Sequence, residues 1–376
     1  SFQRGKSLCR GTECLPAPAT LGALIHTLES QDADPAKHAI FMPTACGPCR
    51  FGQYNLLQRL ALDRIGMDDL FIVSPGSDDT YAGVGTGLQL RLFQGIVIAD
   101  VLTKMRCRTR PYELEPGRVD EIIDEGQLDL QRALEQRRDY LPILARIARR
   151  LRAVPMQRGP RKPLVGIVGE IYVRSNTFCN QDVIGAIEAG GGEAWLSPIS
   201  EWILYTQAME IRMAAVNRRP VDWARARLRN AVIERYERQI YDACGDLLAG
   251  LHEPPVNEVI GAGERFVPVS FEGETIITIG RAVRFIQDGA SMVVNCAPFT
   301  CMPGALTAGV LQQVQQELGA PVISLFYDGT GDVNRRVILT LRNLGSDQLE
   351  PRPPPGASAP DAPHDSAPVR EYGDTL

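Results

Sequence analysis

The stretch KHAIFMPTACGPCRFGQYNLLQRLALDRI, residues 37–65, decides the fold. It begins with a short apolar run at 37–42, typical of a buried strand, and ends with an amphipathic helical pattern at 51–65. A loop with two cysteines lies between them. A second apolar run at 70–74 predicts the next strand, so the segment indicates a βα unit with parallel strands.

Units of the same kind recur along the chain. Further strands are predicted at 164–168, 193–196, 291–295 and 322–326, and helices at 88–107, 121–151 with an interruption near Pro142, 181–189, 274–288 and 304–318, with two more between about 200 and 250. We therefore predict an α/β protein of two Rossmann-like domains with parallel sheets. Its parts are a first domain with an N-terminal cysteine loop (1–153), a linker (154–163), a second domain with a helical insertion (164–344) and a disordered Pro-rich tail (345–376).

Composition excludes several classes of function. The 376 residues carry a net charge of −5, only 6% are aromatic, and no run of 18 apolar residues occurs. We therefore expect no nucleic-acid partner, no membrane partner and a cytoplasmic location. The run at 131–162 has a local charge of +8. It is interpreted as a solvated helix face, or as a docking surface for an acidic partner or for the phosphates of coenzyme A.

The placement of the cysteines carries most of the functional information. Six of the nine cysteines form three close pairs, Cys9 with Cys14, Cys46 with Cys49, and Cys296 with Cys301. Two of these pairs follow predicted strands, where open α/β sheets bind their ligands. A loop that enters a helix also favours thiolate over thiol. Cys107 and Cys244 are expected in the core, and Cys179 is solitary.

Two interpretations of this pattern stay open. The tetrapeptide CGPC at 46–49, between a strand and a helix, is typical of a thiol–disulfide oxidoreductase. Iron–sulfur ligation, which needs thiolates from several loops converging on one point, accounts for all three pairs. Cluster ligation is therefore preferred, and a dithiol using Cys46 and Cys49 is the alternative.

Several motifs in order resemble one family. They are GTECLP (11–16), FMPTACGPCRFGQYN (41–55), TRPYE (109–113), VGEIYVRSN (168–176), SFEGETIITIG (270–280) and PFTCMPG (298–304). The chain resembles, from about residue 8 to 344, the acyl-CoA dehydratase activase-related branch of the 2-hydroxyacyl-CoA dehydratase (component D, double-cubane cluster) superfamily. In larger relatives this segment is the C-terminal part of a chain that begins with an ATPase activase.

The resemblance implies a 4Fe–4S cluster held by Cys14 in TECLP, Cys49 in GPCR and Cys301 in FTCMPG. Three thiolates would leave one iron open. Cys9, Cys46 and Cys296 are the less certain ligands, and six thiolates would instead fit a double-cubane 8Fe–9S cluster. The implied partner is an ATP-hydrolysing activase, separate or fused upstream, that supplies low-potential electrons for reducing or dehydrating a small molecule such as an acyl-CoA. A non-catalytic electron relay is a further alternative.

Three other residues are catalytic candidates. Glu170 and Arg174 follow the strand at 164–168 and would bind substrate or handle protons; capping and salt bridging are the alternative roles. Arg50 beside Cys49 would contact a cluster sulfide or a substrate carboxylate, or would end a helix. The glycines at 83–87 lack the spacing of a dinucleotide fingerprint, so no nucleotide is expected on this chain. A homodimer is an alternative to a monomer.

Overall fold

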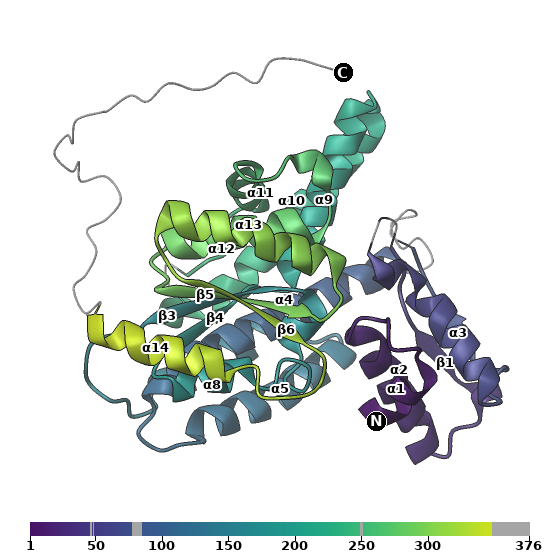
Figure 1. The fold of residues 1–376 in the computed structure, drawn as a ribbon, viewed down its shortest axis with the longest axis horizontal. Coiled ribbons are helices and arrows are strands. Elements are labelled where there is room, and N and C mark those ends of the chain that lie inside the picture. Colours follow the sequence, from purple (N-terminus) through teal and green to yellow (C-terminus); the bar gives the residue numbers. More distant parts are fainter. Residues whose placement is uncertain (46, 48, 77–84, 249–250, 348–376) are drawn as a thin grey trace, which may run out of the picture.

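The computed structural model describes residues 1–45, 47, 49–76, 85–248 and 251–347. Within these ranges the chain is a mixed α/β protein with two parallel sheets (Figure 1). The small sheet pairs β1 (Ala39–Phe41) with β2 (Phe71–Val73). The larger sheet has the order β4-β3-β5-β6 and contains β3 (Leu164–Gly169), β4 (Glu193–Leu196), β5 (Met292–Pro298) and β6 (Val322–Tyr327).

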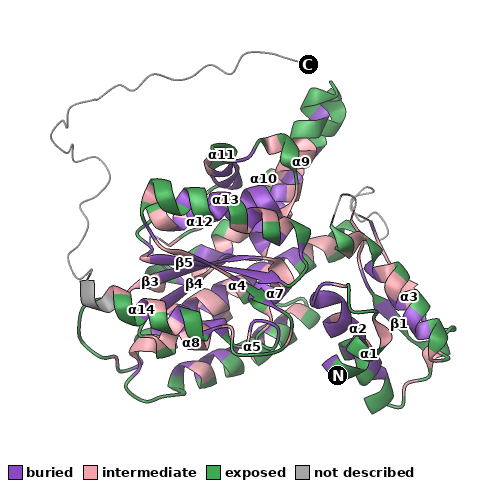
Figure 2. Ribbon diagram, viewed as in Figure 1, coloured by how far each residue is buried: buried purple, intermediate pink, exposed green. Residues whose placement is uncertain are grey.

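Helices cover both faces of the larger sheet. The helices α12 (Glu274–Gln287) and α13 (Met302–Leu318) lie on one face, and α8 (Val183–Ala189) and α14 (Arg335–Asp347) lie on the other (Figure 1). Its central strands are therefore buried on both sides, as Figure 2 shows. Burial on both faces requires nearly continuous apolar runs, and this is why these strands could be predicted from the sequence.

The small sheet is covered less completely. The helices α1 (Phe2–Leu8), α2 (Pro16–Ser30) and α3 (Tyr54–Arg64) build this part with the two short strands. Ile40 packs in a small core with residues of α2 and α3. In contrast, Phe41 and Phe71 are 53% and 68% exposed.

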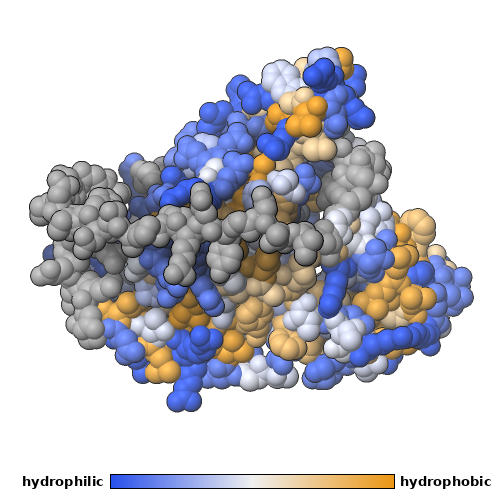
Figure 3. Space-filling view, turned by 45° about the horizontal axis from the view of Figure 1, so that its top comes forward, coloured by the Kyte–Doolittle hydropathy of each residue, from blue (hydrophilic) through white to orange (hydrophobic). Residues whose placement is uncertain are grey.

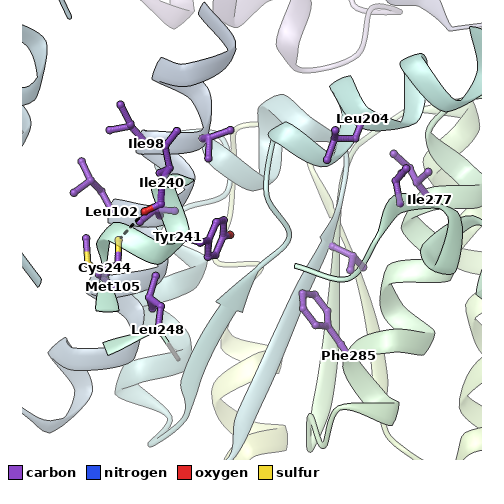
Figure 4. Packing of buried hydrophobic residues seen from close by; sticks show 14 of the residues in the cluster. Ile98, Leu102, Met105, Leu204, Ile240, Tyr241, Cys244, Leu248, Ile277 and Phe285 are labelled. Atoms are coloured by element: carbon purple, nitrogen blue, oxygen red, sulfur yellow. Dashed lines mark hydrogen bonds between the residues drawn. The ribbon is translucent and has the colours of Figure 1, made fainter. Parts of the chain in front are cut away.

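The remaining helices surround the larger sheet, and all but the shortest of them pack in one extended core. They are α4 (Thr86–Thr109), α5 (Arg118–Glu135), α6 (Leu141–Arg152), α7 (Ile171–Ser175), α9 (Ser200–Val216), α10 (Pro220–Ala243) and α11 (Val256–Glu264). Five short 3-10 turns occur in the described ranges, η1 (Pro35–Lys37), η2 (Arg50–Gln53), η3 (Arg110–Tyr112), η4 (Gly245–Leu247) and η5 (Val269–Phe271). Figure 4 shows part of the core, where Cys244 packs near Leu102, Met105 and Leu248. No helix of the described ranges is both long and apolar enough to span a bilayer.

The predicted elements are largely confirmed. Helices α5 and α6 are separated close to Pro142, and α9 and α10 occupy the region between about 200 and 250. Three expectations were wrong in detail. Strand β5 extends to Pro298, so Cys296 lies within the strand rather than after it. Helix α1 lies before Cys9 and was not among the predicted helices. Helix α14 runs to Asp347, into the predicted tail; residues 348–376 lie outside the described ranges.

Candidate functional site

Three of the predicted cysteines lie on loops that enter helices. Cys14 lies two residues before α2, which begins with Pro16. Cys49 is the residue before η2, and Cys301 is the N-cap residue of α13, after the carboxyl end of β5. Proline near the helix start is favoured because its missing N–H has no partner there in any case. The local sequence therefore fixes where each loop ends.

The three thiols lie within electrostatic reach of one another. The charge of Cys14 contributes to raising the pKa of both Cys49 and Cys301. Because such an influence falls with distance, Cys14 lies in the neighbourhood of both other cysteines.

Each buried thiol also has a specific hydrogen-bond partner. Cys14 Sγ lies 2.7 Å from Tyr54 Oη. Cys301 Sγ accepts a hydrogen bond from the backbone N–H of Gly304, at 3.3 Å. Residue 304 has little room for a side chain, because a Cβ atom there would lie 2.8 Å from Cβ of Ala297. These contacts fix the directions of two of the three sulfur atoms.

Arg50 ties the three cysteine loops together. Its guanidinium donates to the carbonyl oxygen of Thr12, before Cys14, and lies 3.4 Å from Oγ1 of Thr300, before Cys301. Arg50 itself follows Cys49. Thr300 has a φ of +67°, which is strained for a β-branched residue and must be held by its surroundings. Arg50 is therefore a positioning residue for all three loops.

Two carboxylates lie beside the thiols. Glu170 is the N-cap of α7 and accepts hydrogen bonds from the amides of Tyr172 and Val173, at 3.1 and 2.8 Å. Glu274, the first residue of α12, accepts from the amide of Ile171 at 2.8 Å. The charges of both glutamates contribute to raising the pKa of Cys49 and of Cys301. The site therefore combines thiols with carboxyl groups.

Burial makes these carboxyl groups hard to ionise. It is the largest cause that raises the pKa of Glu274 to about 8, and the charge of Glu170 adds to it. Burial also raises the pKa of Glu170, although Arg174 and two amides act against the rise. At neutral pH the site can therefore hold a proton on Glu274.

Arg174 is a structural link at the edge of this site. It is 2% exposed and donates to the carbonyl oxygens of Gly169, at 2.5 Å, and Pro198, at 3.0 Å. Its Nε atom has no partner among the described residues. The guanidinium therefore joins the ends of β3 and β4 and is the buried positive charge facing the two glutamates.

The thiols differ from the predicted thiolates. Burial, the largest cause, raises the pKa of Cys301 to about 12, and it also raises the pKa of Cys14 and Cys49. The backbone N–H groups at the helix starts lower these values, but burial and the two glutamates outweigh them. These cysteines are therefore protonated at neutral pH.

Two of the other three predicted ligands have different surroundings. Cys9 packs partly buried against the small core, and Cys296 is fully buried on β5 with its Sγ 3.7 Å from Tyr327 Oη. Cys46 lies outside the described residues. Across the described ranges, no group of three or more Cys, His, Asp or Glu side chains is arranged to hold a single metal ion.

Cys107, Cys179 and Cys244 are buried in hydrophobic clusters. This confirms the core placement predicted for Cys107 and Cys244. Cys244 Sγ donates to the carbonyl oxygen of Ile240 at 3.4 Å (Figure 4). A buried cysteine of this kind behaves as a small apolar residue.

Sequence reasoning missed Glu274 and Tyr54 as members of the site. Glu274 starts a helix far along the chain from the cysteine loops, and Tyr54 opens α3. Both lie inside motifs that carry the family resemblance, SFEGETIITIG and FMPTACGPCRFGQYN. The motifs were thus the signal that could have identified them.

Comparison with family models, with curated proteins and with solved structures finds no match for this chain. The arrangement of its own residues is therefore the basis for inferring its function.

Proposed function

We propose that Cys14, Cys49 and Cys301 hold an iron–sulfur cluster of the 4Fe–4S type. The observation that carries the proposal is the convergence of the three cysteine loops on Arg50, which follows Cys49 and contacts both Thr12, before Cys14, and Thr300, before Cys301. Thiols converging from several loops are the donor set that such clusters require. A cubane separates its ligands more widely than a single ion does, so the lack of a compact single-ion site among the described residues does not conflict with this donor set.

The surroundings of Cys49 do not favour the dithiol alternative. A reactive cysteine of a thiol–disulfide oxidoreductase needs a lowered pKa, in electropositive surroundings. Cys49 instead has a raised pKa, because of burial and the nearby charges of Glu274, Cys14 and Glu170. Bound iron would supply the missing positive charge and stabilise the thiolates. The raised pKa therefore favours ligation over dithiol exchange.

When bound, such a cluster supplies one electron at a time at low potential. The resemblance suggests an ATP-hydrolysing activase as the source of electrons and an acyl-CoA or similar small molecule as the acceptor. On this chain Glu274 would hold a proton for a reduced substrate, and Glu170 and Arg174 would fix the charge around it. Arg50 would keep the three loops together.

We interpret the two sheets as the centres of two Rossmann-like domains with the cysteine site between them. In such folds the carboxyl ends of parallel strands carry the ligand. Cys301 and Glu170 follow β5 and β3 at that edge, and Cys49 follows β1. An oxygen-labile cluster and eight free cysteines in the described ranges would suit a reducing, cytoplasmic compartment.

Anaerobic reconstitution with iron and sulfide tests the proposal. We expect about four iron atoms per chain for a single cubane, and about twice that number for a double cubane. Cys14→Ala, Cys49→Ala and Cys301→Ala should each lose most of the iron and the EPR signal of the reduced state. Cys244→Ala, in the core, is the matched control and should keep both.

Equal iron in all four variants would contradict the ligand assignment. Absence of iron together with a reversible Cys46–Cys49 disulfide, mapped by mass spectrometry, would replace the cluster with a dithiol function.

A further inference from the structure

Helices α9 and α10 form a hairpin that projects from the body of the molecule (Figure 1). One face of α10 is built into the protein, because Ala226, Ile233 and Ile240 are buried at intervals of seven residues. Such an interval keeps side chains on one side of a helix. The inner face of α10 is therefore accounted for by packing within the chain.

A second apolar face of α10 is uncovered. Val221, Leu228 and Val232, at intervals of seven and four residues, are 61%, 70% and 40% exposed. The alanines at 224 and 231, which lie on the same side, are also exposed. This stripe, Val221–Leu228–Val232 with the two alanines, extends over about 16 Å of helix. A helix with an outer apolar stripe of this length is suited to pack against another helix.

Positive charge surrounds the stripe. Residues 211–228 hold five arginines and one acid, a local charge of +4 in a chain of net charge −5. None of the ion pairs formed by the described residues includes Arg218, Arg219 or Arg225. In Figure 3 the end of the hairpin, at the top of the view, mixes strongly hydrophilic with hydrophobic residues.

The basic run of α6 differs in this respect. Its arginines Arg146, Arg150 and Arg152 are paired with Asp129, Glu125 and Asp246. These acids neutralise much of the charge that the sequence places there. The arginines at 218, 219 and 225 of the hairpin have no such acidic partners among the described residues and stay available to a partner molecule.

The base of the hairpin is attached to the cysteine site. Tyr205 of α9 accepts a hydrogen bond from the amide of Gly273, the residue before Glu274, at 2.6 Å. The carbonyl oxygen of Pro198, just before α9, accepts from Arg174. The hairpin thus rises from the same edge of the sheet as the site residues.

We propose that the outer face of α10 docks an acidic protein, through a helix whose apolar side packs on Val221, Leu228 and Val232. Carboxylates flanking that helix would face Arg225 and the arginines at the hairpin end. Such a partner would be held beside the cysteine site; its role as the electron donor of that site rests on the proposed function.

Other occupants fit the surface less well. A second copy of the chain would bring the same unpaired arginines against these and be repelled. A membrane would require the apolar residues to gather at the tip. The stripe instead runs back along the side of α10, and Trp223 lies on another side with the Arg227 guanidinium 5.7 Å from its ring centre.

A labelled amphipathic peptide with a leucine seam flanked by glutamates is the probe. Its binding to the full chain is measured by fluorescence anisotropy at low and high salt. We expect Leu228→Asp and Arg225→Glu each to weaken binding tenfold or more, and salt to weaken it further. Arg149→Glu on α6, an exposed arginine with the same charge change, is the control and should bind as the wild type does.

Peptide binding that is equal in all variants would overturn the proposal. So would binding of phosphatidylserine vesicles in place of the peptide, or a dimer in light scattering that Leu228→Asp disperses. These binding measurements do not require the cluster, so they test docking even if the proposed function is wrong.

In protein reconstituted with iron and sulfide, Leu228→Asp should slow reduction of the cluster by an acidic flavodoxin and leave its reduction by dithionite unchanged. Failure to incorporate a cluster would count against the proposed function and not against docking.

Discussion

The four-stranded sheet is covered by helices on both faces, whereas the two-stranded sheet leaves Phe41, Phe71 and Val73 exposed. Strands β3, β5 and β6 have six or seven residues each, and β1 and β2 have three. Because hydrophobic burial supplies most of the folding free energy, the larger sheet must contribute far more of it.

The candidate site draws on both regions. The larger sheet positions Cys301, Glu170 and Glu274, and the small sheet contributes the loops of Cys14 and Cys49. The contacts that join the two sides include Arg50 with Thr300 and the ring pair of Phe2 and Phe178, at 5.5 Å. Phe2, Leu15 and Ala19 also pack in the buried cluster on one face of the larger sheet. The half of the site on the larger sheet is therefore supported by an extensive core. The half on the small sheet has a smaller core of its own and depends more on contacts with the larger sheet.

The largest expected effect comes from comparing the same substitution in the core beside the larger sheet, at Phe285 of α12, and in the small sheet, at Phe71 of β2. Phe285 is fully buried, with its ring 5.0 Å from that of Trp195 and packed on Gly166 of β3. Phe285→Ala should lower the free energy of unfolding by about 3–5 kcal/mol, because it leaves a cavity. Phe71→Ala should change it by about 0.5 kcal/mol or less. Denaturant unfolding followed by circular dichroism measures both.

A similar loss in the two variants would show that the small sheet buries Phe71 in solution. The comparison between the two regions would then fail.

A second expectation concerns the carboxyl group of Glu274. Its pKa in the folded protein is about 8, above its ordinary value near 4.5. The folded state therefore favours the protonated form, and the associated stability is complete below about pH 4.5 and lost as the pH rises through 8. We expect the free energy of unfolding of the metal-free protein to fall by about 3–4 kcal/mol between about pH 5 and pH 8.

Glu274→Gln should flatten this pH dependence, since the amide does not ionise. Glu258→Gln, on the exposed side of α11, is the control and should retain it. A pH dependence that persists unchanged in Glu274→Gln would assign the effect to other groups.

The contrast between the sheets also explains how far the sequence could be interpreted. Continuous apolar runs predicted the larger sheet because both of its faces are buried. The same continuity concealed the end of β5, since Cys296, Ala297 and Pro298 extend an already apolar run into the strand. A cysteine is as acceptable in a core as a small hydrophobic residue, so pairing alone did not separate Cys296 from Cys301.

Residues that join the site through tertiary packing could not be located in this way. Glu274 begins a helix whose apolar pattern could be predicted, but no local pattern places that helix start beside Glu170. The contacts of Arg50 likewise cross 38 and 250 residues of sequence. Local propensity does not determine such contacts, because they depend on how the two halves meet.

Arg50→Ala tests the attachment of the two halves at a single contact, because it removes the contact with Thr300 and leaves both hydrophobic cores intact. A hydrogen bond from a charged donor contributes about 1.5–3 kcal/mol, so local opening at the site should become about tenfold more frequent. Cys14 and Cys301, both buried in the wild type, should then be alkylated about tenfold faster in the metal-free protein, as followed by peptide mass spectrometry. Arg50→Lys should give an alkylation rate between those of the wild type and Arg50→Ala, since lysine keeps the charge but not the forked geometry.

The control is Arg10→Ala, which removes an exposed arginine from the loop that contains Thr12 and Cys14 and should be alkylated at the wild-type rate. If Arg50→Ala and Arg10→Ala label alike, the two halves are held together without the guanidinium, and the small sheet is more firmly attached than its open face suggests.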